Sequence, residues 1–249
     1  MVILKSREEI EKLREVNALV AEFFEKVGEI IEPGISTFDL EEFSEKFVRE
    51  KKVIPAFKGY MGYPANLCVS INEEVVHGIP DRKRVLKEGD LVSIDFGLKK
   101  DGFFGDAART FPVGQVDEAG KRLLAVTEEA LYRGIEEAKP GRRLYDISAA
   151  IQEFVEGHGF SVVRDYVGHG IGRSLHEDPQ VPNFGVRGTG IKLLPGLVIA
   201  IEPMVNEGGH EVEVLKDGWT VVTKDRKRSA HFEHSVAVTE NGALILSTI

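Results

Sequence analysis

Two aspartates, Asp95 and Asp106, lie on either side of a short polar turn and have the spacing needed to act together. Each interrupts an apolar stretch that reads as a strand, Leu91–Phe96 for the first and Phe103–Phe111 for the second. A hairpin with the four-residue loop Lys99–Gly102 would place the two carboxylates directly opposite each other, with Cβ atoms about 4.5–5.5 Å apart. Like charges about 4 Å apart repel by ~1 kcal/mol in water and ~4 kcal/mol at an effective dielectric of 20. We therefore expect a shared proton or a bound cation between them, unless one aspartate faces solvent.

Three further residues have side chains that could complete a cation site. Glu202 interrupts an apolar stretch over residues 197–205, and Glu233 leads into another strand-like segment. His169 lies among the glycines of Gly168–Gly172, which leave little side-chain cover over its ring. A buried carboxylate is costly unless it is paired or binds a metal ion.

Four carboxylates and one imidazole form an oxygen-rich donor set. Such a set indicates a site for Mn²⁺, Fe²⁺, Co²⁺ or Zn²⁺ and not a structural zinc site built from thiolates. Their charge exceeds what one divalent ion neutralises, so we expect two ions that share bridging carboxylates. Two-metal sites of this kind catalyse hydrolysis. The sequence does not determine which metal is used.

Five of the remaining histidines fall into two groups. His77 and His176 lie in loops rich in glycine and proline, where they could donate hydrogen bonds near the metals, contact substrate or be ordinary loop residues. His158, His210 and His231 show no such context, and we assign them no role.

Composition limits the classes of protein that this chain could be. It has 249 residues, 32 Lys and Arg against 41 Asp and Glu, and a net charge of −9, which argues against non-specific binding to nucleic acid or to anionic membranes. Its one cysteine, Cys68, cannot form an intrachain disulfide and indicates a reducing compartment. The first residues do not form a signal peptide, and the apolar run 197–201 is too short to span a bilayer. We expect a soluble cytoplasmic protein.

Helices and strands alternate along the chain without a linker. Ser6 and Glu9 form a capping-box pattern that begins a helix ending at Pro33–Gly34, and Ser36 or Thr37 begins a second helix. A third helix is expected over residues 117–138, and a fourth ends near Gly159. Strands are expected at residues 67–71, 91–96, 103–111, 197–201, 211–215, 219–223, 235–239 and 243–246.

A faint internal repeat relates the two halves of the chain. At an offset of 107 positions the following segments correspond: Pro33–Gly34 with Pro140–Gly141, Phe38–Leu40 with Tyr145–Ile147, Gly89 with Gly196, and Asp95 with Glu202. Coincidence is the alternative, since Pro-Gly pairs are common in turns. We expect a single catalytic domain over residues 1–249, with halves of about 1–110 and 111–249 related by a pseudo-two-fold axis.

Several motifs in this order resemble one family over essentially the whole chain. The matching segments are Gly59–Pro64, Ser70–Pro80, Asp95, Asp101–Asp106, Gly168–Gly172, His176–Pro179, Ile201–Pro203 and Glu233–His234. Together they resemble the type I methionine aminopeptidases, metallopeptidases with the pita-bread fold. The resemblance implies an α+β fold in which two pseudo-two-fold-related halves form an antiparallel sheet covered by helices.

The resemblance also implies roles for individual residues. The metal ligands would be Asp95, Asp106, His169, Glu202 and Glu233. Asp106 and Glu233 would bridge two divalent ions, which could be Co, Mn, Fe or Zn, and Glu202 would also carry a proton. His77 and His176 would act on the substrate peptide, with His176 stabilising the oxyanion. The methionine pocket would be formed by Phe57, Tyr60, Tyr63, Cys68, His77, Leu175, His176 and Trp219.

The implied activity is removal of the N-terminal methionine from nascent proteins and peptides with a small second residue, by attack of water activated by two metal ions. The partners would be nascent polypeptide N-termini at the ribosome, and the protein would be a monomer. A monovalent-cation site would lie near Asn72 and Ser229. Phe57 and Leu175 depart from the cysteine and phenylalanine that are common at these positions in bacteria, which changes the shape of the pocket.

Two other functions remain open. Aminopeptidase P and prolidase share the ligand set, but usually carry a separate N-terminal domain that we do not expect ahead of Ser6. A non-catalytic binding protein with the same fold should have lost ligands, whereas all five are present.

Overall fold

One antiparallel sheet of nine strands organises the chain, and the structure, a computed structural model, describes residues 2–248. Its main path runs β1-β4-β5-β14-β9-β7-β8, with β2 paired to β4 and β15 paired to β14. The bounds are β1 (Ile54–Pro55), β2 (Leu67–Ile71), β4 (Leu91–Lys100), β5 (Phe103–Pro112), β7 (Gly168–Gly170), β8 (Glu177–Val181), β9 (Val198–Ile201), β14 (Glu233–Thr239) and β15 (Gly242–Ile245).

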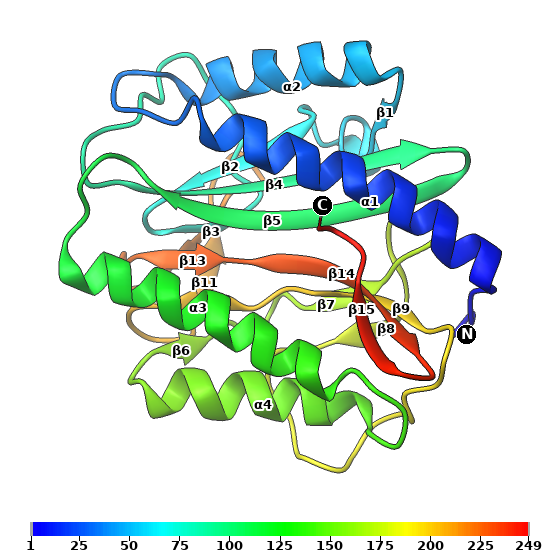
Figure 1. Cartoon of the computed structure of the whole chain (residues 1–249). Coiled ribbons are helices and arrows are strands. Elements are labelled where there is room, and N and C mark those ends of the chain that lie inside the picture. Colours follow the sequence, from blue (N-terminus) through cyan, green and yellow to red (C-terminus); the bar gives the residue numbers. More distant parts are fainter. Residues whose placement is uncertain (1, 249) are drawn as a thin grey trace.

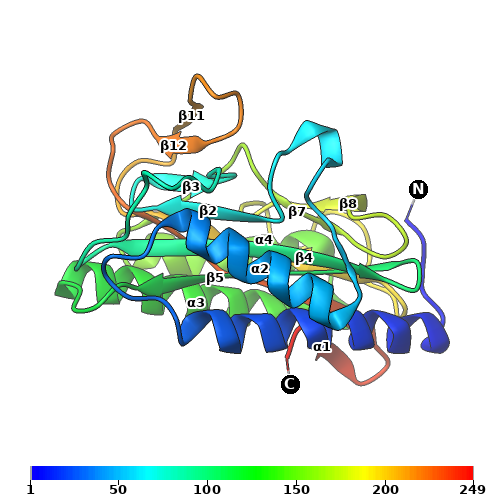
Figure 2. The same ribbon diagram turned by 90° about the horizontal axis from the view of Figure 1, so that it is seen from above.

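Four helices accompany this sheet in residues 2–248: α1 (Arg7–Gly28), α2 (Thr37–Lys51), α3 (Glu118–Glu137) and α4 (Leu144–Gly157). Figure 1 shows α1 across β4 and β5, and Figure 2 shows α1 and α3 along one face of the sheet with β11 and β12 beyond its other face. Two small sheets lie off the main one. They are β13-β10-β6, with β6 (Ser161–Val162), β10 (Met204–Asn206) and β13 (Ser229–His231), and β11-β12-β3, with β3 (Glu74–Val76), β11 (Val212–Val214) and β12 (Val221–Thr223). A short 3₁₀ helix, η1, spans Tyr60–Gly62.

The helix starts read from the sequence hold closely, but α1 ends at Gly28, ahead of the Pro33–Gly34 expected to end it. Ser6 caps α1 through the expected capping box with Glu9, and Ser36 caps α2. The fourth helix ends at Gly157, two residues before the expected Gly159, which has a φ of 80°. Within residues 2–248 no helix is both long and apolar enough to cross a membrane.

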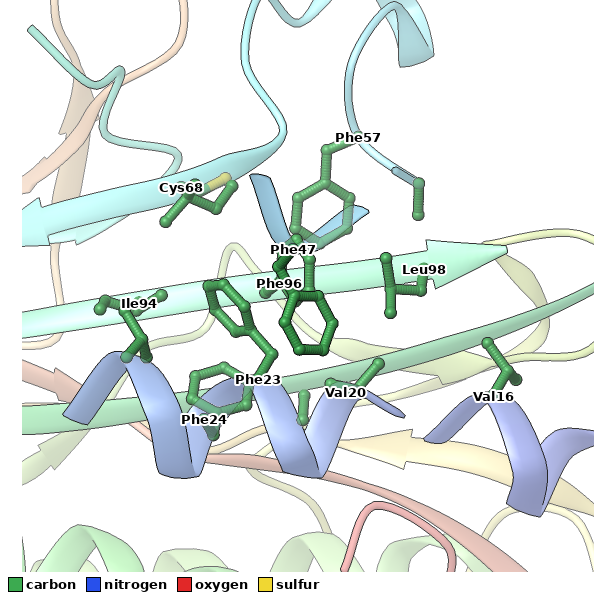
Figure 3. Packing of buried hydrophobic residues seen from close by; sticks show 14 of the residues in the cluster. Val16, Val20, Phe23, Phe24, Phe47, Phe57, Cys68, Ile94, Phe96 and Leu98 are labelled. Carbon is green, nitrogen blue, oxygen red and sulfur yellow. The ribbon is translucent and has the colours of Figure 1, made fainter. Parts of the chain in front are cut away.

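Aromatic packing joins the helices to the sheet. The α1 side chains Val16, Val20 and Phe23 recur at helical spacing and are buried. The Phe23 ring stacks on Phe96 of β4 with centroids 3.8 Å apart, and Figure 3 shows Phe47 of α2 beside them. Because side chains alternate along a strand, the burial of Phe96 toward α1 directs its neighbour Asp95 to the opposite face.

The hairpin between β4 and β5 differs from the one expected. Its loop has two residues, Asp101 and Gly102, with φ values of 50° and 83°, so the four-residue loop was wrong. Positive φ at both positions is the geometry that an Asp-Gly pair adopts in a two-residue hairpin turn. Asp106 therefore lies opposite Gly97, and Asp95 lies opposite Ala108. The shift of two positions keeps both aspartates on one face, so they are diagonal neighbours instead of a direct pair.

The two halves repeat one another in local detail. An isolated bridge joins Ser36 to Val85 in the first half, and another joins Arg143 to Lys192 in the second, at the expected offset. In both halves the backbone N–H at the helix start donates to the aspartate three positions on, Ser36 to Asp39 at 2.7 Å and Arg143 to Asp146 at 2.8 Å. These matching contacts support the repeat as a feature of the fold.

Candidate metal centre

Five neighbouring strands of the main sheet each bring one predicted ligand to the same place. Asp95 lies on β4, Asp106 on β5, Glu233 at the start of β14, Glu202 directly after β9, and His169 on β7. These strands follow one another in the sheet, so residues far apart in the sequence converge. All five side chains line one cavity of about 220 Å³.

The distances place ligand atoms around a shared centre. His169 Nε2 lies 3.6 Å from Glu202 Oε1 and 3.9 Å from Asp106 Oδ2. Ligand atoms of Asp106, His169 and Glu233 all lie within 4.8 Å of one another. These separations are too long for hydrogen bonds and leave room for an ion between the atoms.

Burial makes the carboxylates costly without a counter-ion. It raises the pKa of Asp95 to about 7 and that of Glu202 to about 8. Burial first, and the neighbouring carboxylates second, hold the pKa of Asp106 and Glu233 well above their ordinary values. Asp95 Oδ1, Asp106 Oδ1 and Glu233 Oε1 are buried without a hydrogen-bond partner among the described residues. Oxygen atoms left unpaired in this way fit divalent cations.

His169 is prepared to act as a ligand. Its Nδ1 lies 2.9 Å from the carbonyl oxygen of Gly170, which leaves Nε2 facing the carboxylates. Burial lowers its pKa to about 3, so the ring is neutral, as metal binding requires. A Cβ atom on Gly168 would lie 2.3 Å from the Ala200 carbonyl oxygen, so glycine allows the close approach of β9.

The remaining predicted site residues surround the same cavity. It is lined by all eight residues expected at the methionine pocket: Phe57, Tyr60, Tyr63, Cys68, His77, Leu175, His176 and Trp219. The Tyr63 and Trp219 rings meet edge to face with centroids 5.1 Å apart. An aromatic chamber thus adjoins the carboxylates.

His176 lies between the two parts of the cavity. Its ring centroid is 4.3 Å from that of His169, and its Nδ1 is 2.8 Å from the Tyr60 hydroxyl oxygen. Burial lowers the pKa of His176, so its ring is neutral near pH 7. His77 has a φ of 61°, and burial lowers its pKa to about 4.

Two residues that lie near the site, His231 and Tyr166, were assigned no role from the sequence. His231, to which no role was assigned, is buried with its Nε2 3.6 Å from Glu202 Oε2 and no hydrogen-bond partner for that nitrogen among the described residues. The available signal was its position two residues before Glu233 in a strand-like segment. Tyr166 also lines the cavity and meets His77 edge to face. No motif distinguished it.

The two residues expected near a monovalent cation also meet. The Ser229 backbone N–H donates to the Asn72 carbonyl oxygen at 2.8 Å. Asn72 has a φ of 53°, and its side-chain amide donates to Asp90.

Comparison with known proteins agrees with this geometry. The model of metallopeptidase family M24 matches residues 11–240. Methionine aminopeptidase 1 of Bacillus subtilis is 53% identical over the full length of both chains. The crystal structure of methionine aminopeptidase from Thermotoga maritima matches with a TM-score of 0.98 and 52% identity over all of both chains. Prolidase from Pyrococcus furiosus, at 24% identity, shares the fold with a TM-score of 0.78 over 99% of this chain and 66% of its own.

These matches confirm the α+β pita-bread fold and the resemblance to the type I methionine aminopeptidases. The matched region includes every carboxylate and histidine that lines the cavity. The chain belongs to metallopeptidase family M24.

Proposed function

We propose that this protein removes the N-terminal methionine from nascent proteins and peptides whose second residue is small. The observation that carries the proposal is the aromatic chamber that opens directly onto the five converging ligands. Identity of 53% to a methionine aminopeptidase over the whole chain supports a metal-dependent aminopeptidase.

The ligand set would hold two divalent ions. Asp95 would bind one ion, His169 and Glu202 the other, and Asp106 and Glu233 would bridge them, as the resemblance to the type I methionine aminopeptidases implies. Two ions bound there supply a nucleophile from water at neutral pH and stabilise negative charge on the carbonyl oxygen. Cobalt, manganese, iron and zinc all suit these ligands.

The chain's own residues would move the proton and hold the peptide. The Glu202 carboxylate, which lines the cavity, would take a proton from water and return it to the leaving amine. If the Tyr60 hydroxyl donates to His176 Nδ1, the proton of that neutral ring lies on Nε2. His176 can then donate from Nε2 to the carbonyl oxygen as charge develops, while His77 contacts the peptide from the opposite loop.

The chamber suits a thioether side chain. Sulfur packs favourably against aromatic rings, and both Tyr63 and Trp219 line the chamber. The second residue of the substrate would lie beside the loops that carry His77 and His176. A bulky side chain there would collide with them.

A proline-directed peptidase is less well supported. The match to prolidase has only 24% identity and covers 66% of that protein. A binding protein without activity is also disfavoured, because all five ligands converge on one cavity.

A matched peptide series tests the specificity. We expect Met-Ala, Met-Gly and Met-Ser peptides to be hydrolysed far faster than Met-Leu or Met-Lys, measured as kcat/KM with each candidate metal. Chelation should abolish the activity and added Mn²⁺, Co²⁺ or Fe²⁺ should restore it. Equal rates across the series would overturn the assignment, and hydrolysis of Xaa-Pro peptides would support a proline-directed peptidase instead.

The same proposal extends to the setting of the enzyme. A net charge of −9 and a lone buried cysteine support a cytoplasmic protein without nucleic-acid binding of its own. Its partners would be nascent N-termini at the ribosome, and it would act as a monomer with a monovalent cation near Asn72 and Ser229.

A further inference from the structure

The turn between β7 and β8 presents both Leu175 and His176 to the cavity, and a single carboxylate holds its backbone. Glu177 Oε1 accepts hydrogen bonds from the backbone N–H of Arg173 at 2.8 Å and of Ser174 at 3.1 Å. Glu177 thereby closes the turn on itself, directly next to His176.

The second carboxylate oxygen of Glu177 contacts Lys5, near the N-terminus of the chain. Lys5 Nζ lies 2.5 Å from Glu177 Oε2, and the two side chains are only 3% and 10% exposed. The same ammonium donates to the carbonyl oxygen of Ile3 at 3.0 Å. Figure 1 shows this N-terminal segment beside β8 and β9, far in sequence from its partner.

Lys5 is itself anchored by its backbone. Its N–H donates to the Gly196 carbonyl oxygen at 2.7 Å, just ahead of β9. The packing around the pair is tight, because a Cβ atom on Gly172 would lie 2.4 Å from Lys5 Cε and 2.7 Å from Glu177 Oε1. Lys5 therefore connects the segment just ahead of β9 to the turn, through its backbone at one end and its ammonium at the other.

Such a pair is poorly explained by stability alone. Removing two charges from water costs free energy that their attraction often does not recover, so a buried pair of apolar residues would serve stability equally well. Charged groups can instead fix one geometry, because each oxygen and each N–H has a defined partner.

We propose that Lys5 and Glu177 are positioning residues that fix the turn 172–177 and thereby aim His176 at the substrate carbonyl. The inference rests on the proposed role of His176 in oxyanion stabilisation. Lys5 acts from outside the cavity and touches neither the ligands nor the substrate.

A mutant cycle between Lys5 and His176 tests the proposal. Lys5→Met should lower kcat by roughly 10- to 100-fold with little change in KM, since misplacement of a catalytic group by about 1 Å has effects of this size. His176→Ala should lower kcat by about 10²–10³-fold. In the His176→Ala background, Lys5→Met should change kcat by less than about twofold, because the group that it positions is gone. Effects that multiply in the double variant would overturn the proposal.

Amide hydrogen exchange gives a readout that does not depend on activity. In Lys5→Met the Arg173 and Ser174 amides should exchange faster, whereas Lys5→Arg should restore both exchange protection and kcat. Unchanged exchange of these amides would overturn the positioning role. If these amides exchange faster in Lys5→Met but His176→Ala keeps the wild-type kcat, the proposed role of His176 is overturned. The connection between Lys5 and the turn is then still supported.

Controls separate positioning from a general loss of folding. Lys51→Met removes an ion pair that does not line the cavity, with Glu22 at 2.6 Å between α1 and α2, and should leave kcat and metal content unchanged. Should Lys5→Met fail to fold, Glu177→Gln removes the charge at nearly constant size, and the same cycle and exchange measurements apply.

Discussion

Glu202 lies between two imidazoles, and only one of them was expected from the sequence. One carboxylate oxygen faces His169 at 3.6 Å and the other faces His231 at the same distance. Thr110 holds the backbone of His231 through its Oγ1, which accepts from the His231 N–H and donates to the His231 carbonyl oxygen, each at 2.8 Å. The backbone of His231 is therefore fixed beside the carboxylate proposed to carry the proton.

We predict that His231→Leu lowers kcat by roughly 10- to 100-fold, because the polar group that faces the Glu202 carboxylate at 3.6 Å is lost. His231→Gln should retain most of the rate, because the glutamine amide nitrogen can occupy the place of Nε2. Steady-state kinetics with metal analysis of both variants provide the measurement. Wild-type rates in His231→Leu would show that the ring only fills space.

Residue types predicted much of this site, but contacts between distant residues could not be predicted. Asp95, Asp106, Glu202, Glu233 and His169 stood out because charged groups in apolar stretches need partners. The role of a histidine depends on the groups that contact it, and the groups that contact His231 lie on other strands. For the same reason the contact of Tyr60 with His176 was not foreseen.

At the scale of elements, the β4–β5 hairpin shows how register controls the site. Its two-residue turn places Gly97 opposite Asp106. Alternation along the strands correctly predicted that both aspartates share a face, but not their offset. Loop length alone decides that offset, and the polar run 99–102 allows two lengths.

We predict that Gly97→Ala damages the metal centre. A Cβ atom there would lie 2.9 Å from Phe57 Cε1, 3.0 Å from Ala56 Cβ and 3.1 Å from Asp106 Oδ1. The strain should cost about 1–3 kcal/mol of unfolding free energy and displace Asp106 or Phe57. Metal content, KM for methionine peptides and thermal melting would report it.

The matched control is Gly157→Ala at the end of α4. A Cβ atom there meets nothing within 4 Å, so the variant should keep metal content, KM and stability. A Gly97→Ala variant that behaves like this control would mean that Asp106 tolerates the crowding.

At the scale of the whole molecule, the buried carboxylates connect metal binding to stability. The pKa of Asp95 is raised to about 7 and that of Glu202 to about 8, chiefly by burial, whereas unfolded carboxyl groups titrate near pH 4. The folded metal-free protein therefore holds protons that the unfolded chain has released. Stability from these groups is full below about pH 4 and is lost as the pH rises through 7 and 8.

We predict that the melting temperature of the chelated protein falls between pH 6.5 and 8.5. Buried histidines with a lowered pKa, such as His169, change the stability mainly below pH 6.5. They therefore add little to the pH dependence of the melting temperature between pH 6.5 and 8.5. Divalent ions should remove the decrease, because they replace the missing protons as counter-charge. Calorimetry with and without Mn²⁺ checks this, and a melting temperature that rises with pH in the chelated protein would contradict it.

The two halves of the chain bear on how it unfolds. We propose that residues 1–249 form one catalytic domain with halves of about 1–110 and 111–249, of which residues 1 and 249 lie outside the described part. The halves share the central pairing of β5 with β14, and Ser235 Oγ donates to the Asp106 carbonyl oxygen across it at 2.8 Å. The core cluster around Phe23 also includes Leu175, Val198 and Leu246 of the second half. Neither half could bury its apolar surface alone.

We therefore predict a single cooperative unfolding transition for the chelated protein in denaturant. Fluorescence of Trp219 in the second half and far-ultraviolet circular dichroism of the helices in both halves should give the same midpoint. Separately expressed halves should lack protected amides, since each leaves its side of the β5–β14 pairing open to water. Two transitions, or a folded half, would mean that the repeat consists of two independent units. In that case the metal centre would be an interface between domains, because Asp95 and Asp106 come from one half and His169, Glu202 and Glu233 from the other.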